Sequence, residues 1–570
     1  EEANMKTKYN YVEEINFFSL VNTISVKYKE LVALRNWKQE DSGVTYFNLA
    51  EQAKSIAFDL IKKGVKPGDR VAILGESCSM WGRAYLGIVL AGAVAVPILP
   101  NFTEDEVQKI LQHSQANVIF VNSVNAVKIH SISSSLIVFR LDDLFYIPRK
   151  LKWEKNSRSF MELHGKDTKN TKLNKSDLSI IKSRKRTKDD LASIIYTSGT
   201  TGQSKGVMLT HGNLIINADL SAKSYVKIKP GYRMLSILPL SHVYEFTIGF
   251  IVGLITGCEI VYLNQPPVSS ALMPAMKEVK PNIMLTVPIL IEKVFRRAVL
   301  PKIKSESTLG RLYNNPITQP LVCLLIGSKL KKTFGGQLKF FGIGGAPLDI
   351  ETENFLIKAH FPYAKGYGLT ETSPMIAGCG PNNHRSDCVG LIMNNLEVKI
   401  SDEGEVLVKG PSIMKGYYRN PELTAESFTE DGFLKTGDLG ELTKGKFLAL
   451  KGRCKNMILG PNGENIYPEN IESIINNQEY VEESLVISNG NGELFAMIKI
   501  DIEAIAKNFT VDIEQAQTKA HEILLKIHMD SNKQLNSFSK VKKVEIHQEP
   551  FVRTPTEKIK RYLYQERHIS

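Results

Sequence analysis

The sequence predicts a multidomain α/β protein, and three observations carry this prediction. Helix-like and strand-like segments alternate through the first two hundred residues and again from 232 to 410, which is typical of layered folds with parallel sheets. From about residue 395 the segments become short strands with close turns, which indicates a small β-rich subdomain that completes a large N-terminal domain. After Arg453 a compact unit mixes helices and strands, which indicates a small α+β domain at the C-terminus.

The bulk composition is that of a globular protein with a sizeable core. The chain has 570 residues, of which 43% are hydrophobic and 23% charged, an ordinary balance for such proteins. Its six cysteines form no C-x-x-C pair, so neither a disulfide framework nor a zinc site is expected. The longest apolar stretch, 84–100, contains glycines and prolines and is too short to cross a membrane, and no signal-peptide pattern is visible. We therefore expect a cytoplasmic protein.

Apolar spacing and turn residues place the elements of the large domain. Apolar residues recur at helical spacing over 49–61 and 81–91, so these segments are predicted as helices. Short apolar runs bounded by turn residues are predicted as strands. They cover residues 70–75, 94–98, 117–121, 135–140, 235–238, 259–263, 282–287, 338–342, 397–400 and 404–409.

The C-terminal unit is predicted by the same criteria. Helices are expected over 468–476 and 513–528, and strands over 483–488, 494–500 and 541–548. We place the domain boundary near Lys455, which divides the chain into residues 1–454 and 455–570.

One segment, 166–188, is strongly basic. It holds nine Lys and Arg against two Asp, in a chain whose formal net charge is +12. A run of this kind is most often a solvated loop. Its functional alternatives are peripheral contact with the inner, anionic face of a membrane and contact with nucleic acid. Because the chain has no RNP motif, zinc finger or basic zipper, we do not expect a nucleic-acid partner.

The most informative segment is a loop rich in glycines and hydroxyls that ends on a lysine. It covers residues 196–206, follows the apolar run 191–195 and precedes a second strand-like run, 207–210. Backbone N–H groups and hydroxyls of such a loop can converge on an anion, and Lys205 adds a full positive charge. A polyphosphate is therefore the expected ligand. Gly206 stands where a Walker loop needs Ser or Thr, which disfavours a P-loop NTPase. A flexible surface loop is the structural alternative.

The loop matches the pattern S/T-S-G-S/T-S/T-G-x-P/S-K-G at every position. Through this match the chain resembles the acyl-adenylate-forming superfamily of AMP-dependent synthetases and ligases. Later segments resemble the remaining family motifs in the family's order; they are 238–245, 344–348, 365–372, 433–439, 451–455, 463–472 and 553–561. The His-x-x-Glu form of segment 238–245, together with Trp81 and the run 287–293, is most similar to the long-chain fatty acid–CoA ligases.

The resemblance implies a role for each motif residue. The residues that would bind ATP or AMP are Thr197, Ser198, Gly199, Thr200, Thr201, Gly202, Lys205, Gly345, Ala346, Pro347, Tyr367, Gly368, Thr370, Asp438 and Arg453. The residues that would take part in catalysis are Lys558, Glu371, Thr370 and His242, and Glu371 would also hold Mg²⁺. Lys455 would be the hinge residue, and Gly463 would line the channel for the pantetheine arm of coenzyme A.

The implied function is the ATP-dependent activation of a long-chain fatty acid to acyl-AMP, with release of pyrophosphate, followed by acyl transfer to the thiol of coenzyme A. The large domain would hold ATP and the acid, and the small domain would be mobile and carry Lys558. The implied ligands are therefore a fatty acid, ATP, Mg²⁺ and coenzyme A. Two alternatives stay open: an acyl carrier protein as the thiol acceptor, and a non-catalytic lipid- or membrane-binding relative.

Overall fold

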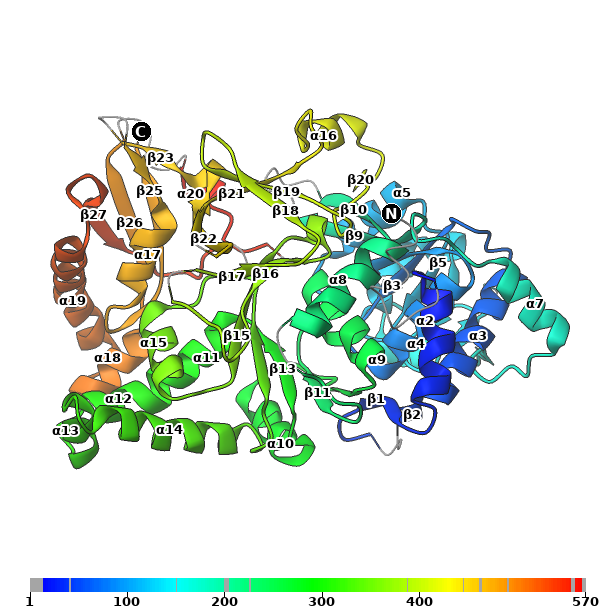
Figure 1. Cartoon of the computed structure of the whole chain (residues 1–570), viewed down its shortest axis with the longest axis horizontal. Coiled ribbons are helices and arrows are strands. Elements are labelled where there is room, and N and C mark those ends of the chain that lie inside the picture. The colour runs from blue at the N-terminus through cyan, green and yellow to red at the C-terminus, as the bar shows by residue number, and fades with distance from the viewer. Residues whose placement is uncertain are drawn as a thin grey trace.

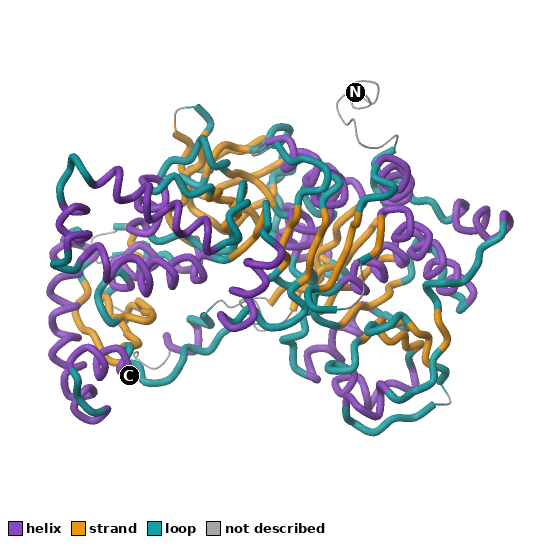
Figure 2. Tube along the Cα trace, turned by 90° about the horizontal axis from the view of Figure 1, so that it is seen from below, coloured by secondary structure: helices purple, strands orange, loops and turns teal. Residues whose placement is uncertain are grey.

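The computed structural model shows an elongated molecule with a large body and a smaller C-terminal unit at one end (Figure 1). The structure describes residues 14–39, 43–149, 151–198, 204–224, 227–386, 388–443, 445–460, 464–489, 492–554 and 559–565. Strands lie in the interior of the body and helices cover them on the outside (Figure 2). The predicted layered α/β fold is confirmed.

The first large sheet has nine strands and is built mainly from the first 210 residues. In spatial order its strands are β20 (Gly416–Tyr417), β10 (Ser204–Thr210), β9 (Leu191–Ser198), β4 (Val94–Ile98), β3 (Arg70–Leu74), β5 (Val118–Val121), β6 (Ile137–Arg140), β7 (Phe145–Ile147) and β8 (Lys166–Asp167). The strands from β9 to β6 are parallel, whereas β10 pairs antiparallel with β9 as a hairpin.

The second large sheet has thirteen strands. In spatial order they are β18 (Glu397–Ile400), β19 (Glu405–Lys409), β21 (Leu434–Thr443), β22 (Phe447–Arg453), β17 (Gly390–Ile392), β16 (Met375–Gly378), β15 (Tyr363–Gly368), β14 (Phe340–Ile343), β13 (Ile283–Thr286), β11 (Arg233–Ser236), β12 (Glu259–Tyr262), β1 (Val32–Asn36) and β2 (Val44–Thr45). The strands from β15 to β1 are parallel. From β16 onward the pairing is antiparallel, so the β-rich part continues this sheet instead of forming one of its own.

The helices of the body cover both large sheets. They are α2 (Phe17–Lys27), α3 (Tyr46–Lys62), α4 (Ser79–Leu90), α5 (Glu104–Ser114), α6 (Ser157–Met161), α7 (Lys175–Ser183), α8 (His211–Ser224), α9 (Val252–Thr256), α10 (Ser269–Val279), α11 (Pro288–Val294), α12 (Leu300–Lys304), α13 (Thr308–Asn314), α14 (Gln319–Thr333), α15 (Ile350–Lys358) and α16 (Pro421–Glu426). A π-helical stretch, Glu245–Ile251, leads directly into α9. No helix in the described ranges is both long and apolar enough to cross a bilayer.

The C-terminal unit has a three-stranded sheet and a core of its own. Its strands are β25 (Val481–Ser488), β26 (Leu494–Ile500) and β27 (Val541–Ile546), preceded by the short pair β23 (Ile458–Leu459) and β24 (Asn465–Ile466). Its helices are α17 (Pro468–Asn476), α18 (Ile502–Phe509), α19 (Ile513–Gln534) and α20 (Tyr562–Gln565). Arg296 of the body donates hydrogen bonds to the Asn476 carbonyl and, at 2.8 Å, to the Asn477 side chain, which holds the end of α17 against the body.

The interpretation of 166–188 as a loop is wrong in part. This segment contains β8 and the helix α7, whose start is fixed by a reciprocal capping box between Asn174 and Asp177. Ile181 on the inner face of α7 is buried, which ties the helix to the body. The high charge of the segment led to the prediction of a loop. The capping box and the burial of Ile181 are nevertheless sufficient to order a short basic helix.

Candidate functional site

The glycine-rich loop connects the two strands of a hairpin at one edge of the first sheet. Thr197 of β9 lies directly across from Lys205 of β10, and Ser198 lies across from Ser204. Both predicted strands that flank the loop are therefore present. The loop residues Gly199, Thr200, Thr201 and Gly202 lie outside the described residues, as does the Ser198 side chain.

A tyrosine from a distant segment joins Lys205 to Glu371. Strand β20 pairs with β10 and places Tyr417 across from Val207. The Tyr417 hydroxyl donates a 2.8 Å hydrogen bond to the Glu371 carboxylate, and the Lys205 ammonium lies 5.4 Å from the centre of the Tyr417 ring. Burial, together with the adjacent Glu371 carboxylate, raises the pKa of Tyr417, so its hydroxyl stays a donor. Tyr417 thus has an ammonium near its ring and a carboxylate at its hydroxyl, a combination of charges that suits a phosphate chain with a bound cation.

Sequence reasoning missed Tyr417. It lies in no motif that was recognised, and only the pairing of β20 with β10 reveals its role. Thr370 precedes Glu371 in the short 3₁₀ turn Thr370–Thr372, which β15 leads into. Both residues are half-buried, so their side chains retain access to solvent.

A second polar group surrounds Asp438 on the antiparallel strands. Asp438 of β21 lies across from Arg453 of β22, and the Arg453 guanidinium is 2.8 Å from the carboxylate. The other carboxylate oxygen accepts a 2.7 Å hydrogen bond from the Tyr367 hydroxyl. Asp438 and Tyr367 are both buried. These two contacts fix the orientation of the Asp438 carboxylate, whose oxygens are hydrogen-bond acceptors.

The glycine turn after β14 is an exposed backbone surface. Gly345, Ala346 and Pro347 are exposed, and Gly345 has the positive φ of 87° that glycine tolerates. The turn lies at the carboxyl ends of parallel strands, where open α/β sheets bind ligands. Gly368, at the end of β15, has no room for a side chain, because an added Cβ would lie 1.7 Å from the Pro374 carbonyl oxygen. Because Gly345 has no side chain and the turn 345–347 is exposed, a flat base could lie directly against its backbone.

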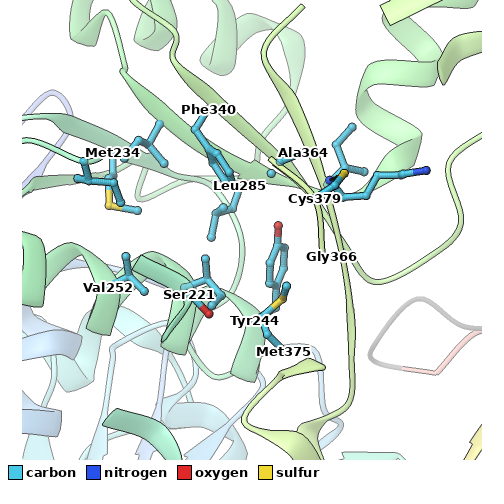
Figure 3. A pocket seen from close by; sticks show the side chains of 16 residues that line it. Ser221, Met234, Tyr244, Val252, Leu285, Phe340, Ala364, Gly366, Met375 and Cys379 are labelled. Atoms are coloured by element: carbon cyan, nitrogen blue, oxygen red, sulfur yellow. Dashed lines mark hydrogen bonds between the residues drawn. The ribbon is translucent and has the colours of Figure 1, made fainter. Parts of the chain in front are cut away.

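An apolar cavity extends into the body beside this turn (Figure 3). It is enclosed by α8, the helix 245–256 and strands β11 and β13–β16. Apolar lining side chains include Met234, Ile248, Val252, Leu285, Phe340 and Met375. Tyr244 stands between the cavity and the turn, because its ring lies 3.1 Å from where a Cβ on Gly344 would be. The cavity and the turn therefore share Tyr244 as a neighbour.

His242 lies just before the helix that lines the cavity. It is half-buried, and its Nδ1 accepts a 3.3 Å hydrogen bond from the Tyr244 backbone N–H. In the neutral ring this bond leaves the proton on Nε2. Ile248 and Val252 follow Tyr244 at four-residue intervals, so one face of this helix lines the cavity over a length on the order of 10 Å.

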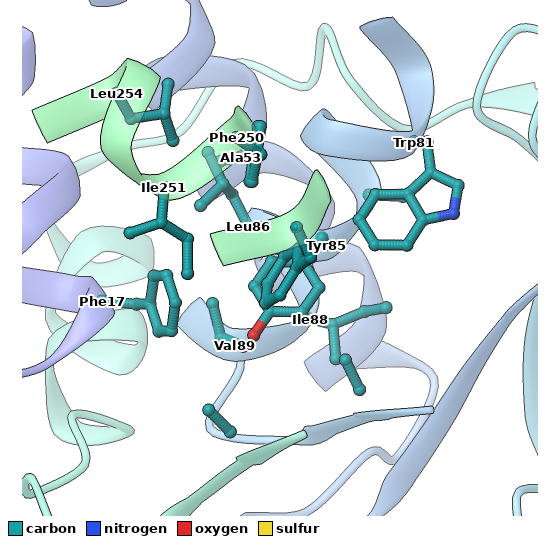
Figure 4. Packing of buried hydrophobic residues seen from close by; sticks show 14 of the residues in the cluster. Phe17, Ala53, Trp81, Tyr85, Leu86, Ile88, Val89, Phe250, Ile251 and Leu254 are labelled. Carbon is teal, nitrogen blue, oxygen red and sulfur yellow. The ribbon is translucent and has the colours of Figure 1, made fainter. Parts of the chain in front are cut away.

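The opposite face of the same helix packs into the main core. Phe250, Ile251 and Leu254 pack there with Tyr85 and Leu86 of α4 (Figure 4). Glu245, in the first turn of this helix, is also buried, and one of its carboxylate oxygens has no hydrogen-bond partner among the described residues. Burial raises the pKa of Glu245 to about 8, although the nearby Ser236 hydroxyl acts in the opposite direction. Glu245 is therefore neutral below that pH.

We expect Glu245→Gln to remove a pH-dependent loss of stability. In the unfolded chain this carboxyl ionises near its ordinary pKa, whereas in the folded chain it stays protonated up to about pH 8. Between these values the native state binds more protons, so the free energy of unfolding falls as pH rises, by up to about 1.4 kcal/mol per pH unit. Urea unfolding at pH 5.5 and pH 8 should show the variant gaining stability relative to wild type at the higher pH.

The matched control for this measurement is Glu430→Gln, because Glu430 is exposed. Its stability relative to wild type should be the same at both pH values. A constant difference between Glu245→Gln and wild type across this range would show that the carboxyl is ionised in the core. His211 does not confound the comparison, because both proteins carry it; burial lowers its pKa to about 3, and it destabilises the fold only as pH falls below the ordinary histidine value.

The remaining motif residues lie in or near the C-terminal unit. Lys455 is exposed in the 3₁₀ turn Cys454–Asn456, directly after β22. Lys558 and Gly463 lie outside the described residues. The domain boundary and the roles of these three residues stay predictions.

Comparisons with known proteins agree with the architecture. The chain is 30% identical over 485 residues to a long-chain-fatty-acid–CoA ligase of Mycobacterium bovis (FadD15), covering 81% of this chain and 78% of that protein. It is 30% identical to the human long-chain-fatty-acid–CoA ligase ACSBG2, covering 75% of this chain and 67% of that protein.

Solved structures share the fold at lower sequence identity. ATP-bound MatB from Rhodopseudomonas palustris superposes with a TM-score of 0.72 at 23% identity, covering 97% of this chain and 99% of that one. The o-succinylbenzoate–CoA synthetase MenE from Bacillus subtilis, in complex with ATP and magnesium, superposes with a TM-score of 0.70 at 22% identity, covering 95% and 98%. The sequence pattern of AMP-binding enzymes matches residues 23–418. The chain belongs to the AMP-binding enzyme family.

Proposed function

We propose that this protein is an AMP-forming fatty acid–CoA ligase that acts on long-chain acids. The observation that carries the proposal is the position of the apolar cavity beside the glycine turn: Tyr244 lines the cavity and its ring also lies against Gly344. That arrangement places the carboxyl end of a buried acyl chain next to a nucleotide. The long-chain-fatty-acid–CoA ligases to which the chain is similar support the choice of substrate.

Lys205 and Glu371 would hold the phosphates of ATP. Lys205 supplies positive charge from the hairpin, and Glu371 supplies a hard oxygen ligand oriented by Tyr417. The described residues contain no group of three or more His, Cys, Asp or Glu that could hold a metal alone. One carboxylate suits Mg²⁺, which takes most of its ligands from phosphates and water. Bound there, Mg²⁺ would neutralise charge on the phosphates.

Each of the other nucleotide-binding residues has a proposed contact. The Gly345–Pro347 turn and the Tyr367 ring would hold adenine between them. Asp438 would accept hydrogen bonds from the ribose hydroxyls, with Arg453 beside it. Thr370 would donate to the α-phosphate, while Thr197, Ser198, Gly199, Thr200, Thr201 and Gly202 would surround the β- and γ-phosphates.

The first step requires positive charge between two anions. The acid's carboxylate attacks the α-phosphorus, the bond to the pyrophosphate oxygen breaks, and acyl-AMP remains. Lys558 would place its ammonium between the two reactants and so offset their repulsion. His242, at the start of the helix that lines the cavity, would border the reacting carboxyl.

The second step requires the small domain to move. A thiolate attacks the acyl carbonyl and AMP leaves with the electron pair of the anhydride bond. Lys558 would obstruct this attack, so the unit 455–570 would turn about Lys455 and bring Gly463 to the thiol channel of the large domain, 1–454. Coenzyme A is the favoured thiol because the similar proteins are CoA ligases; an acyl carrier protein is the second candidate.

The test is pyrophosphate release with palmitate, octanoate, acetate and an aromatic acid, each with coenzyme A, with an acyl carrier protein and with neither. Palmitate and coenzyme A should give the highest kcat/KM for thioester formation. Pyrophosphate release with none of the acids would favour the non-catalytic lipid-binding alternative.

We expect Val252→Phe to shorten the acyl cavity. Val252 lines the cavity two turns beyond Tyr244, and its side chain is buried there. A phenyl ring would occupy the space of the distal methylenes, so kcat/KM for palmitate should fall at least about tenfold relative to octanoate, which corresponds to about 1.4 kcal/mol. Val252→Ala, which widens the same place, should keep the preference for palmitate. Equal losses for both acids would mean that the acyl chain lies elsewhere.

Contact between the basic segment 166–188 and a membrane is the weaker part of the proposal. Several of its charges are already engaged: Lys169 donates to the Asp143 carbonyl, Lys185 pairs with Glu14, and Arg186 pairs with Asp190. Paired charges attract anionic lipid less than free ones do.

A further inference from the structure

The helix α14 has apolar residues on two opposite faces. Its inner face is buried in the second core cluster through Val322, Cys323, Gly327 and Leu330. Its outer face presents Leu321, Leu324 and Leu325, which are 60%, 42% and 62% exposed, and Ile317 just before the helix is 88% exposed. Single exposed leucines are ordinary, but three on one face of α14, with Ile317 just before the helix, place four large exposed apolar side chains within nine residues. We call Ile317, Leu321, Leu324 and Leu325 the outer patch.

The charged residues near the outer patch in the sequence have one sign. Lys329 and Lys332 are exposed on the last turns of α14, and Lys332 continues the stripe of Leu321 and Leu325. Neither lysine forms an ion pair within the described part of the chain. From residue 307 to 348 the sequence has five Lys or Arg and no Asp or Glu, although the whole chain has 60 acidic residues. Apolar side chains beside unpaired lysines are complementary to an anionic lipid surface.

The position of α14 at the edge of the molecule is suitable for contact with a flat membrane surface. In Figure 1 α14 lies along the lower edge of the molecule with α10 and α13, on the periphery of the large body. Its long axis follows that edge, so the outer patch and the two lysines can meet a flat surface together. A helix that lies in the interface buries only its apolar side chains between the headgroups.

We propose that the outer face of α14 docks the protein on an anionic lipid bilayer. The outer patch inserts between the headgroups, while Lys329 and Lys332 pair with lipid phosphates. A second copy of the chain fits this face less well, because a two-fold contact would bring the same unpaired lysines together without any acidic residue from 307–348 to offset them.

The docking site lies close in sequence to the acyl cavity. Six residues join the end of α14 at Thr333 to Phe340, the first residue of β14, which lines the cavity. If the proposed function holds, docking here would place the enzyme on the phase in which long-chain acids concentrate. The docking itself does not depend on that function, because it involves no residue of the nucleotide site.

The test is flotation of the full-length protein with lipid vesicles, without substrates. The vesicles contain phosphatidylcholine with about one third phosphatidylglycerol, and pure phosphatidylcholine vesicles serve as the comparison. Wild type should bind the anionic vesicles, and raising the salt to about 0.5 M should reduce the bound fraction. Leu321→Gln/Leu325→Gln and, separately, Lys329→Glu/Lys332→Glu should each lower the partition coefficient at least about fivefold.

Two control variants test whether the loss of vesicle binding is specific to changes on α14. Leu525→Gln/Met529→Gln changes an equally exposed pair at the same spacing on α19, and Lys175→Glu/Lys182→Glu changes the charge of α7. Both should bind vesicles as wild type does, and all four variants should keep the wild-type circular dichroism and Tm. Wild-type binding by the α14 variants, or equal binding to both kinds of vesicle, would overturn the proposal. A dimer by light scattering that dissociates in Leu321→Gln/Leu325→Gln would assign the patch to a second copy instead.

These measurements can refute the docking proposal and the proposed function independently of each other. Loss of binding with unchanged thioester formation from octanoate, a soluble acid, supports docking as a separate property of the face. A protein that binds vesicles but releases no pyrophosphate with any acid would contradict the proposed function and leave the docking surface intact.

Discussion

Lys558→Ala should slow acyl-adenylate formation at least about a hundredfold and leave thioester formation from ready-made acyl-AMP nearly unchanged. In the first step two anions must meet, so an ammonium between them lowers the barrier directly. In the second step the acyl carbon is already activated, and the turn of the unit 455–570 would have carried Lys558 away from the reacting groups. The first step is measured by exchange of labelled pyrophosphate into ATP, and the second by acyl-CoA formation from synthetic palmitoyl-AMP.

The matched control is Lys560→Ala, which removes an ammonium two residues away. Lys560 is tied by its backbone N–H to the Val552 carbonyl, so its side chain can be removed without changing the local chain path. This variant should keep most of both activities. Equal losses in both steps for Lys558→Ala would show that the lysine supports the fold of the C-terminal unit and does not act in adenylation.

Glu371→Gln should reduce adenylation by roughly a hundredfold to a thousandfold and raise the Mg²⁺ concentration needed for half-maximal rate. Glutamine is isosteric with glutamate, and its carbonyl can still accept the hydrogen bond from Tyr417, so the local structure should be retained. What the variant loses is the negative charge that holds the cation. Magnesium titrations of pyrophosphate release, at saturating ATP and palmitate, separate loss of affinity from loss of maximal rate.

Tyr417→Phe is the companion variant. It removes only the hydrogen bond that orients the Glu371 carboxylate, so we expect at most about a tenfold loss and a smaller shift in the Mg²⁺ requirement. If Glu371→Gln shows the wild-type Mg²⁺ dependence, Glu371 is not the metal ligand. If Tyr417→Phe is as impaired as Glu371→Gln, orientation of the carboxylate matters as much as its charge.

Patterns of short range were sufficient to predict much of the fold. The strands Val94–Ile98, Glu397–Ile400 and Leu494–Ile500 and the helix Pro468–Asn476 begin and end where apolar runs and turn residues place them. The glycine-rich loop was predicted between two strands, and β9 and β10 flank it. These features depend on neighbours within a few residues, so spacing alone reports them. The helices α12–α14 were not predicted, because an apolar stretch with two usable faces gives no clear amphipathic period.

The sequence by itself determined the family, the α/β class and the identity of the charged residues that would meet ATP. Tertiary structure alone decided which of them come together. Tyr417 reaches Glu371 only because β20 pairs with a strand some two hundred residues earlier. Val252 lines the acyl cavity while Glu245 of the same helix is buried away from solvent, and the outer patch of α14 remains uncovered. The physical reason is that strand pairing and the rotation of a helix about its axis depend on contacts between distant segments, which no local pattern encodes.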